Sequence, residues 1–157
     1  MLRQLRTFLQ GQPTVTQASS FLRLVFVLSF GIQLLFAMIL AAILYTLSTK
    51  RADNPLLAQI MILLSFAQLP LALFLSQRSA KSGHRQGLLA AAIMSGVLLS
   101  IPAWFAAMAF LSTTQTIYIF IFLVILMSYY ALGFILCGQW GKLAPNIPTH
   151  QVAKVQE

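Results

Sequence analysis

Charged residues occur in short clusters separated by long uncharged stretches, and this spacing constrains the fold more than any other feature of the sequence. Residues 24–49, 54–77 and 86–141 contain no Asp, Glu, Lys or Arg. A helix needs about 20 apolar residues to cross a hydrocarbon core of roughly 30 Å. The third stretch is long enough for two such helices and a tight turn. The spacing therefore predicts an all-α integral membrane protein, a four-helix bundle in up-down-up-down order.

The expected boundaries follow from caps, prolines and polar loops along the chain. The four membrane-spanning helices are predicted at about residues 20–47, 55–76, 87–111 and 116–139. Together they form a membrane domain over residues 20–140, and residues 141–157 form a polar C-terminal tail. Residues 1–19 form a basic amphipathic segment, whose first ten residues favour a short helix in the membrane interface. A frayed polar terminus is the alternative. The first apolar stretch is too long for the core of a cleaved signal peptide, so we expect a retained helix.

The distribution of Lys and Arg predicts the orientation of the protein in the membrane. Eight of the ten basic residues lie near the N-terminus up to Arg23, in the middle loop or in the C-terminal tail, whereas Lys50 and Arg51 lie on the other side. Basic residues are enriched in cytoplasmic loops. Both termini are therefore expected on the cytoplasmic side, or its equivalent. We attribute the net charge of +8 to this topology and expect no nucleic-acid partner.

The sequence offers few groups for catalysis or metal binding. The two acidic residues are Asp53 and Glu157, the two histidines lie outside the expected spans, and Cys137 is the only cysteine. Proton relays in membranes use ionisable side chains inside the spans, and metal sites use clusters of His, Cys or carboxylate ligands. We therefore expect no catalytic residues, no metal site and no cofactor of the protein's own.

Three glutamines lie inside the expected spans, at Gln33, Gln59 and Gln68. Amides are costly against lipid, so these side chains are expected to form hydrogen bonds between helices. The alternative is contact with a quinone, a pigment or a polar substrate. A lipid, quinone or pigment at the protein surface is compatible with either interpretation.

The third expected span has a regular pattern of small residues. Two rows repeat every four residues, namely Gly87, Ala91 and Ser95, and Ala92, Gly96 and Ser100. Small residues at this spacing allow close approach of helix backbones, here to a neighbouring helix of the bundle or to a second subunit. Pro70 and Pro102 are expected to kink their helices. The apolar run 117–127 has no polar stripe and is expected to face lipid or a partner subunit.

Five basic residues are candidates for contact with anionic lipid headgroups or an acidic partner: Arg3, Arg6, Arg78, Lys81 and Arg85. Each Lys or Arg near an anionic surface contributes about 1 kcal/mol to attraction. The alternative is that these residues only set the topology.

These observations favour a non-catalytic accessory or assembly subunit of a larger membrane complex, such as a respiratory or photosynthetic one. Its partners would be membrane lipids and larger membrane subunits. The alternative is a small transporter or channel that works as an oligomer. A membrane enzyme acting on lipid is the least favoured interpretation, because the expected spans contain no acid or base.

Overall fold

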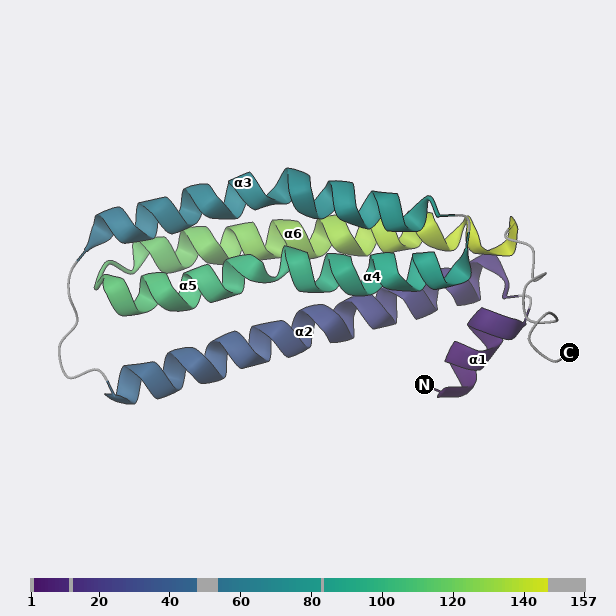
Figure 1. The fold of residues 1–157 in the computed structure, drawn as a ribbon. Coiled ribbons are helices and arrows are strands. Elements are labelled where there is room, and N and C mark those ends of the chain that lie inside the picture. Colours follow the sequence, from purple (N-terminus) through teal and green to yellow (C-terminus); the bar gives the residue numbers. More distant parts are fainter. Residues whose placement is uncertain (1, 12, 48–53, 83, 147–157) are drawn as a thin grey trace, which may run out of the picture.

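The computed structural model describes residues 2–11, 13–47, 54–82 and 84–146, and all regular elements in this part of the chain are helices. They are α1 (Leu2–Gln10), α2 (Val15–Leu47), α3 (Pro55–Ala80), α4 (Arg85–Leu99), α5 (Ile101–Ser112), α6 (Ile117–Gly141) and the 3-10 turn η1 (Ala144–Asn146). Four stretches are long and apolar enough to cross a membrane: α2, α3, α4 with α5, and α6 with η1. The prediction of an all-α, multi-pass four-helix bundle is confirmed (Figure 1).

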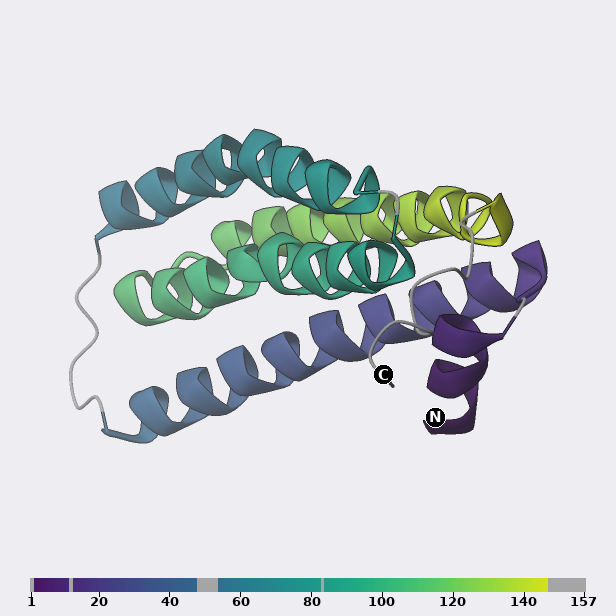
Figure 2. The same cartoon turned by 45° about the vertical axis from the view of Figure 1, so that its right-hand side comes forward.

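The third span, formed by α4 and α5, lies at the centre of the bundle. It packs against α2, α3 and α6, whereas α2 and α3 lie on either side of it and make little direct contact (Figures 1 and 2). Half of the most apolar window of this span is buried, against 22% for α2, 17% for α3 and 22% for α6. The third span therefore connects α2 and α3, although these two helices are consecutive in the sequence.

The third span is interrupted near its middle by a proline. Pro102 lies in the first turn of α5, where its missing N–H breaks the helical hydrogen-bond pattern, and Ser100 separates α4 from α5. The Ser100 hydroxyl donates to the Val97 carbonyl at 2.7 Å, and the Ala103 N–H donates to the Ser100 carbonyl at 2.8 Å. Pro70, in contrast, lies inside one continuous helix, α3, which arches along its length (Figures 1 and 2).

Helix α2 begins at Val15, earlier than the predicted start at residue 20. Thr14 and Gln17 form a reciprocal cap, in which the Gln17 N–H donates to Thr14 Oγ1 at 3.3 Å and the Thr14 N–H donates to Gln17 Oε1 at 3.2 Å. This is the capping-box arrangement, which satisfies two amides that would otherwise lack partners. At 1.5 Å per residue, the 33 residues of α2 span roughly 50 Å, more than a hydrocarbon core.

Helix α3 begins at Pro55, the predicted start of the second span, and Asn54 caps it. The Asn54 side chain accepts a hydrogen bond from the Leu57 N–H at 3.4 Å, and Pro55 occupies the first turn. The Asn54 N–H also donates to the Ser112 carbonyl at 2.8 Å, which ties the start of α3 to the end of α5. The loop that carries Lys50, Arg51 and Asp53 lies outside the described residues, as does the tail from residue 147.

Two clusters of buried side chains hold the bundle together. The larger one extends from α1 to the middle of the bundle, and includes Phe8, Phe26 and Trp140. The smaller one lies at the opposite end and consists of Ala58, Ala109 and Phe122. Helix α1 packs at the end with the larger cluster, beside the first turns of α2 (Figures 1 and 2).

Candidate functional site

The end of the bundle that carries α1, which we call the basic end, contains most of the described Lys and Arg side chains. Arg6 on α1, Arg78 on α3 and Lys81 just beyond α3 are exposed, as the expected contacts with headgroups require. Arg85 is different, because it is only 7% exposed. The side chain of Arg3 lies outside the described part of the chain.

Arg85 joins α1 to the bundle. Its Nη1 donates to the Phe8 carbonyl at 3.3 Å and also to the Gly11 carbonyl. The last carbonyls of a helix lack partners within the helix, and a guanidinium can satisfy them. The expectation that Arg85 contacts headgroups is therefore corrected: the residue caps α1 from the first position of α4. Its partner carbonyls lie more than 70 residues away in sequence, so the spacing of basic residues does not reveal this role.

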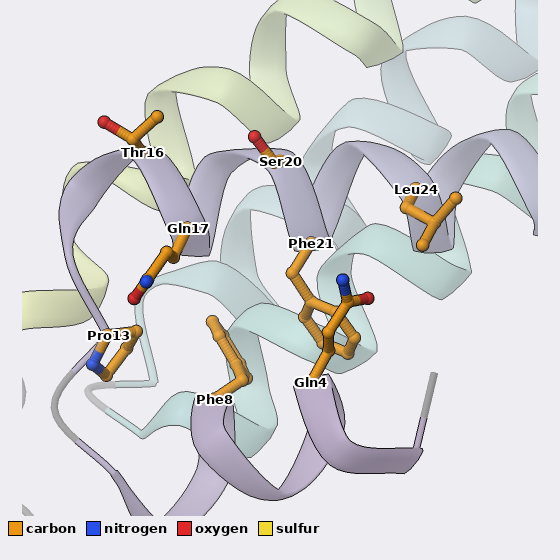
Figure 3. A pocket seen from close by; sticks show the side chains of 8 residues that line it. All are labelled: Gln4, Phe8, Pro13, Thr16, Gln17, Ser20, Phe21 and Leu24. Atoms are coloured by element: carbon orange, nitrogen blue, oxygen red, sulfur yellow. The ribbon is translucent and has the colours of Figure 1, made fainter.

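A hollow of about 590 Å³ lies between α1 and the first turns of α2 (Figure 3). Its apolar part is formed by Phe8 and Phe21, whose ring centroids are 5.1 Å apart, and by Leu24. The other lining residues are Gln4, Pro13, Thr16, Gln17 and Ser20. None of the lining residues is charged, and the volume lies within the usual range for small-molecule sites. The hollow can accept an uncharged group with one apolar and one hydrogen-bonding side.

The three candidate glutamines are not brought together in one site. Gln33 on α2 accepts a hydrogen bond from Trp104 Nε1 on α5 at 3.3 Å. Gln59 on α3 donates from Nε2 to the Tyr118 hydroxyl on α6 at 3.2 Å. The Nε2 of Gln68 is buried without a hydrogen-bond partner among the described residues. The first two amides thus link pairs of helices, and the structure does not assemble a common ligand site from the three.

The small-residue rows of the third span lie against two different helices. A Cβ atom on Gly96 would lie 2.7 Å from Ser29 Cβ and 2.9 Å from the Phe26 carbonyl of α2, so only glycine fits there. At Gly87, a Cβ would meet Ser82 Oγ and, at 2.6 Å, the Ser79 carbonyl at the end of α3. The other members, Ala91, Ala92, Ser95 and Ser100, are all buried. The rows therefore lie at contacts within the bundle.

A second close helix crossing, between α2 and α6, was not predicted from the sequence. A Cβ on Gly133 would meet the Phe26 ring, and a Cβ on Gly141 would lie 2.6 Å from the backbone nitrogen of Ser19. Gly138 lies between them, and its carbonyl accepts a hydrogen bond from Ser19 Oγ at 3.3 Å. The signal in the sequence was the presence of three glycines in the last span, at intervals of five and three residues. These intervals do not form the four-residue rows that we used to identify close packing.

Arg23 occupies the space that Gly138 leaves open. Its Cζ lies 4.5 Å from the centroid of the Phe134 ring, and a Cβ on Gly138 would lie 3.1 Å from Cζ. The side chain is half-buried, and its Nε is buried without a hydrogen-bond partner among the described residues. Long basic side chains near the ends of membrane-spanning helices commonly extend towards the headgroups. The structure shows that the guanidinium of Arg23 also packs on α6.

Tyr129 and Tyr130 on α6 lie in packing positions. The Tyr129 hydroxyl donates to the Ser65 carbonyl of α3 at 2.7 Å. Tyr130 packs against the rings of Phe26, Phe30 and Phe134. Within the described part of the chain, no group of three or more His, Cys, Asp or Glu side chains is placed to hold a metal ion.

Comparisons of the chain with protein-family models, with curated proteins and with solved structures found no match. The functional interpretation therefore depends on the arrangement of the residues described above.

Proposed function

We propose that this protein is a non-catalytic accessory or assembly subunit of a larger membrane complex, which acts by packing against partner subunits and lipid. The observation that supports this proposal best is the division between one enclosed span and three outer spans. The third span is half buried in its apolar window, while α2, α3 and α6 direct large apolar side chains outwards. The surface of such a bundle, rather than its interior, is the part available for function.

Helix α6 offers the clearest surface for a partner subunit. Phe120, Leu123, Val124 and Met127 are each more than half exposed, whereas Phe122 on the opposite side is 1% exposed. The exposed residues form one apolar face near the end of the bundle that is remote from α1. Flat apolar helix faces of this kind pack against lipid or against other membrane helices by van der Waals contact. We propose that a partner helix covers this face in the assembled complex.

The partner complex is expected to be bioenergetic, either respiratory or photosynthetic, with both termini of this chain on its cytoplasmic or equivalent side. The uncharged hollow between α1 and α2 supports this expectation, since it can accept the uncharged head of a quinone or a pigment. Its neutral lining would not repel a carbonyl-bearing ring. Absorption spectra of the assembly purified in mild detergent test this expectation, because bound haem or pigment is visible directly.

The alternative function is a small transporter or channel that works as an oligomer. The interruption of the third span at Ser100 supports this alternative, because such a break can act as a hinge. The centre of the single bundle opposes it. Ala91, Ala92 and Ser95 are at most 1% exposed, and Gly96 lies against the α2 backbone. A polar path would therefore have to form between copies of the chain.

Affinity purification from native membranes in mild detergent distinguishes the two functions. We expect a stable set of larger subunits to copurify with the protein. Replacing Phe120 and Leu123 together with Ala should reduce their recovery several-fold, because the partner helix loses contact area. Replacing the exposed Leu63 and Phe74 of α3 with Ala is the matched control and should leave recovery unchanged. A homo-oligomer without larger partners, with ion or solute flux in liposomes, would contradict the subunit function.

A further inference from the structure

We propose that Arg23 binds the phosphate of an anionic membrane lipid, in the groove where α2 crosses α6 at the basic end of the bundle. This inference depends on the membrane-spanning fold and not on the accessory-subunit function. It adds a lipid site at a residue that the charge pattern assigns only to topology.

The guanidinium of Arg23 is held in a defined position. Phe134 supports it from one side through a cation–π contact, with Cζ 4.5 Å from the ring centroid. Gly138 provides the space, because any side chain there would collide with the guanidinium. The Ser19 hydroxyl, which donates to the Gly138 carbonyl at 3.3 Å, ties this part of α6 to α2. The arrangement is pre-organised, so little side-chain entropy is lost when a ligand binds.

The protein does not neutralise this charge within its described part. Neither acidic residue of the chain is among the described residues, and Asp53 follows the end of α2 that is remote from Arg23. Of the three guanidinium nitrogens of Arg23, Nε alone is buried without a hydrogen-bond partner in the described part of the chain. The side chain is half-buried, which leaves Nη1 and Nη2 as the nitrogens that an external acceptor can reach. An arginine inside a membrane-spanning helix normally pairs with an anion or a polar group, and charge-assisted bonds of Arg to phosphate are among the strongest hydrogen bonds.

The depth of Arg23 identifies the source of the anion. The residue lies eight positions after the start of α2, which is about 12 Å along the helix axis. Residues 24–47, which follow it, are uncharged and form the part of α2 suited to the hydrocarbon core. Arg23 therefore lies where headgroups meet acyl chains, at the level of the lipid phosphates.

Two hydroxyl groups extend the same side of α2 towards the headgroups. Thr16 and Ser20 precede Arg23 by seven and three residues, so the three side chains share one helix face. Both residues are exposed, and they also contribute to the uncharged lining of the hollow beside α1. They can donate to the phosphate oxygens that the guanidinium leaves free. A phosphate diester with a glycerol backbone fits this line of donors better than a single carboxylate does.

Native mass spectrometry of the detergent-purified full chain tests the proposal. The protein is titrated with phosphatidylglycerol and with phosphatidylcholine of identical acyl chains. We expect phosphatidylglycerol to bind about fivefold more tightly, the effect of one basic residue near an anionic headgroup. Arg23→Gln should remove this preference. Lys81→Gln, which changes an exposed basic residue at the same end, is the matched control and should retain it.

Several outcomes would overturn the proposal. They are equal binding of the two lipids by the unaltered protein, an unchanged preference in Arg23→Gln, and competition by inorganic phosphate alone, which would indicate a free-phosphate site. If Arg23→Gln does not fold, Phe134→Leu replaces it, because this variant keeps the charge and removes only the aromatic support. A preference that is unchanged in Phe134→Leu would also contradict the site described here.

Discussion

The basic end and the far end of the bundle are built differently. At the basic end, α2 is crossed closely by α4 at Gly96 and by α6 at Gly141, and its residues from Ala18 to Phe30 contribute to the larger cluster. At the far end, Ala37 is the one buried residue of α2 beyond Phe30. The far half of this helix instead exposes a succession of large apolar side chains.

This difference shows that the position of small residues, rather than their number, decides how tightly membrane helices pack. Gly31 and Gly96 are both glycines within membrane-spanning helices. A Cβ on Gly96 would collide with the α2 backbone, while a Cβ on Gly31 would meet no atom within 4 Å. The basic end is therefore packed closely by contacts within the molecule. The far end leaves its apolar surface for lipid or a partner.

The largest expected effect concerns which side of the membrane each end occupies. Cysteines placed at Thr14 and Lys142 should react with a membrane-impermeant maleimide from one face, and a cysteine at Gln115 only from the other. Cys137 is buried and should contribute no background labelling. Thr14 and Lys142 both lie at the basic end. Labelling of these two positions from opposite faces would therefore contradict the proposed topology.

The contrast between the two glycines can be tested by the same substitution at each. Gly96→Leu should lower the free energy of unfolding by roughly 3 kcal/mol or more, because overpacking forces the α2 backbone away. Gly31→Leu should have almost no effect. Thermal unfolding in detergent, followed by circular dichroism, measures both. Equal stability of the two variants would contradict the close crossing of α2 and the third span.

The attachment of α1 provides a smaller effect, restricted to the basic end. Arg85→Gln should weaken the docking of α1 by about 2 kcal/mol, since hydrogen bonds from charged groups contribute roughly 1.5–3 kcal/mol. Hydrogen exchange should then be faster in residues 2–10 but not in the rest of the bundle. Arg78→Gln removes an exposed charge nearby and is the control. Unchanged protection of α1 in Arg85→Gln would mean that Phe8 alone holds the helix.

The smallest effect is expected between the two ends, where Tyr129 of α6 donates to the Ser65 carbonyl of α3. Tyr129→Phe should cost about 0.6 kcal/mol, the average for hydrogen bonds between membrane helices. Tyr130→Phe changes an adjacent ring that takes part in aromatic packing, and it should cost less. Chemical unfolding of both variants side by side gives the comparison. A larger cost for Tyr130→Phe would assign the role of the pair to ring packing.

The sequence predicted the fold class and the four spans because the relevant energy is local. Each charged side chain is costly in hydrocarbon whatever its neighbours, so the charge-free stretches can be identified without knowledge of the contacts. The start of α3 at Pro55 was predicted for the same reason, since a helix start depends only on adjacent residues. The capping box of Thr14 and Gln17 is equally local and could have been recognised, which would have placed the start of α2 correctly.

The long-range contacts of the site could not be predicted in the same way. The roles of Arg85 and Arg23 depend on which helix faces each residue, and this depends on the rotation of every helix about its axis. A single sequence does not determine these rotations. The same reason explains why the glutamines were correctly placed inside helices, while their separate partners, Trp104 and Tyr118, were not foreseen.

The separation of α2 from α3 has a consequence for the synthesis of the protein. Spans enter the membrane in the order in which the ribosome makes them, yet the first two spans make little contact with each other. Until α4 and α5 are inserted, α2 and α3 remain neighbours in the chain without a shared interface. Folding of the first hairpin therefore has to wait for the third span. A nascent chain halted after Ala80 would present two separate helices to the insertion machinery and to quality-control proteases.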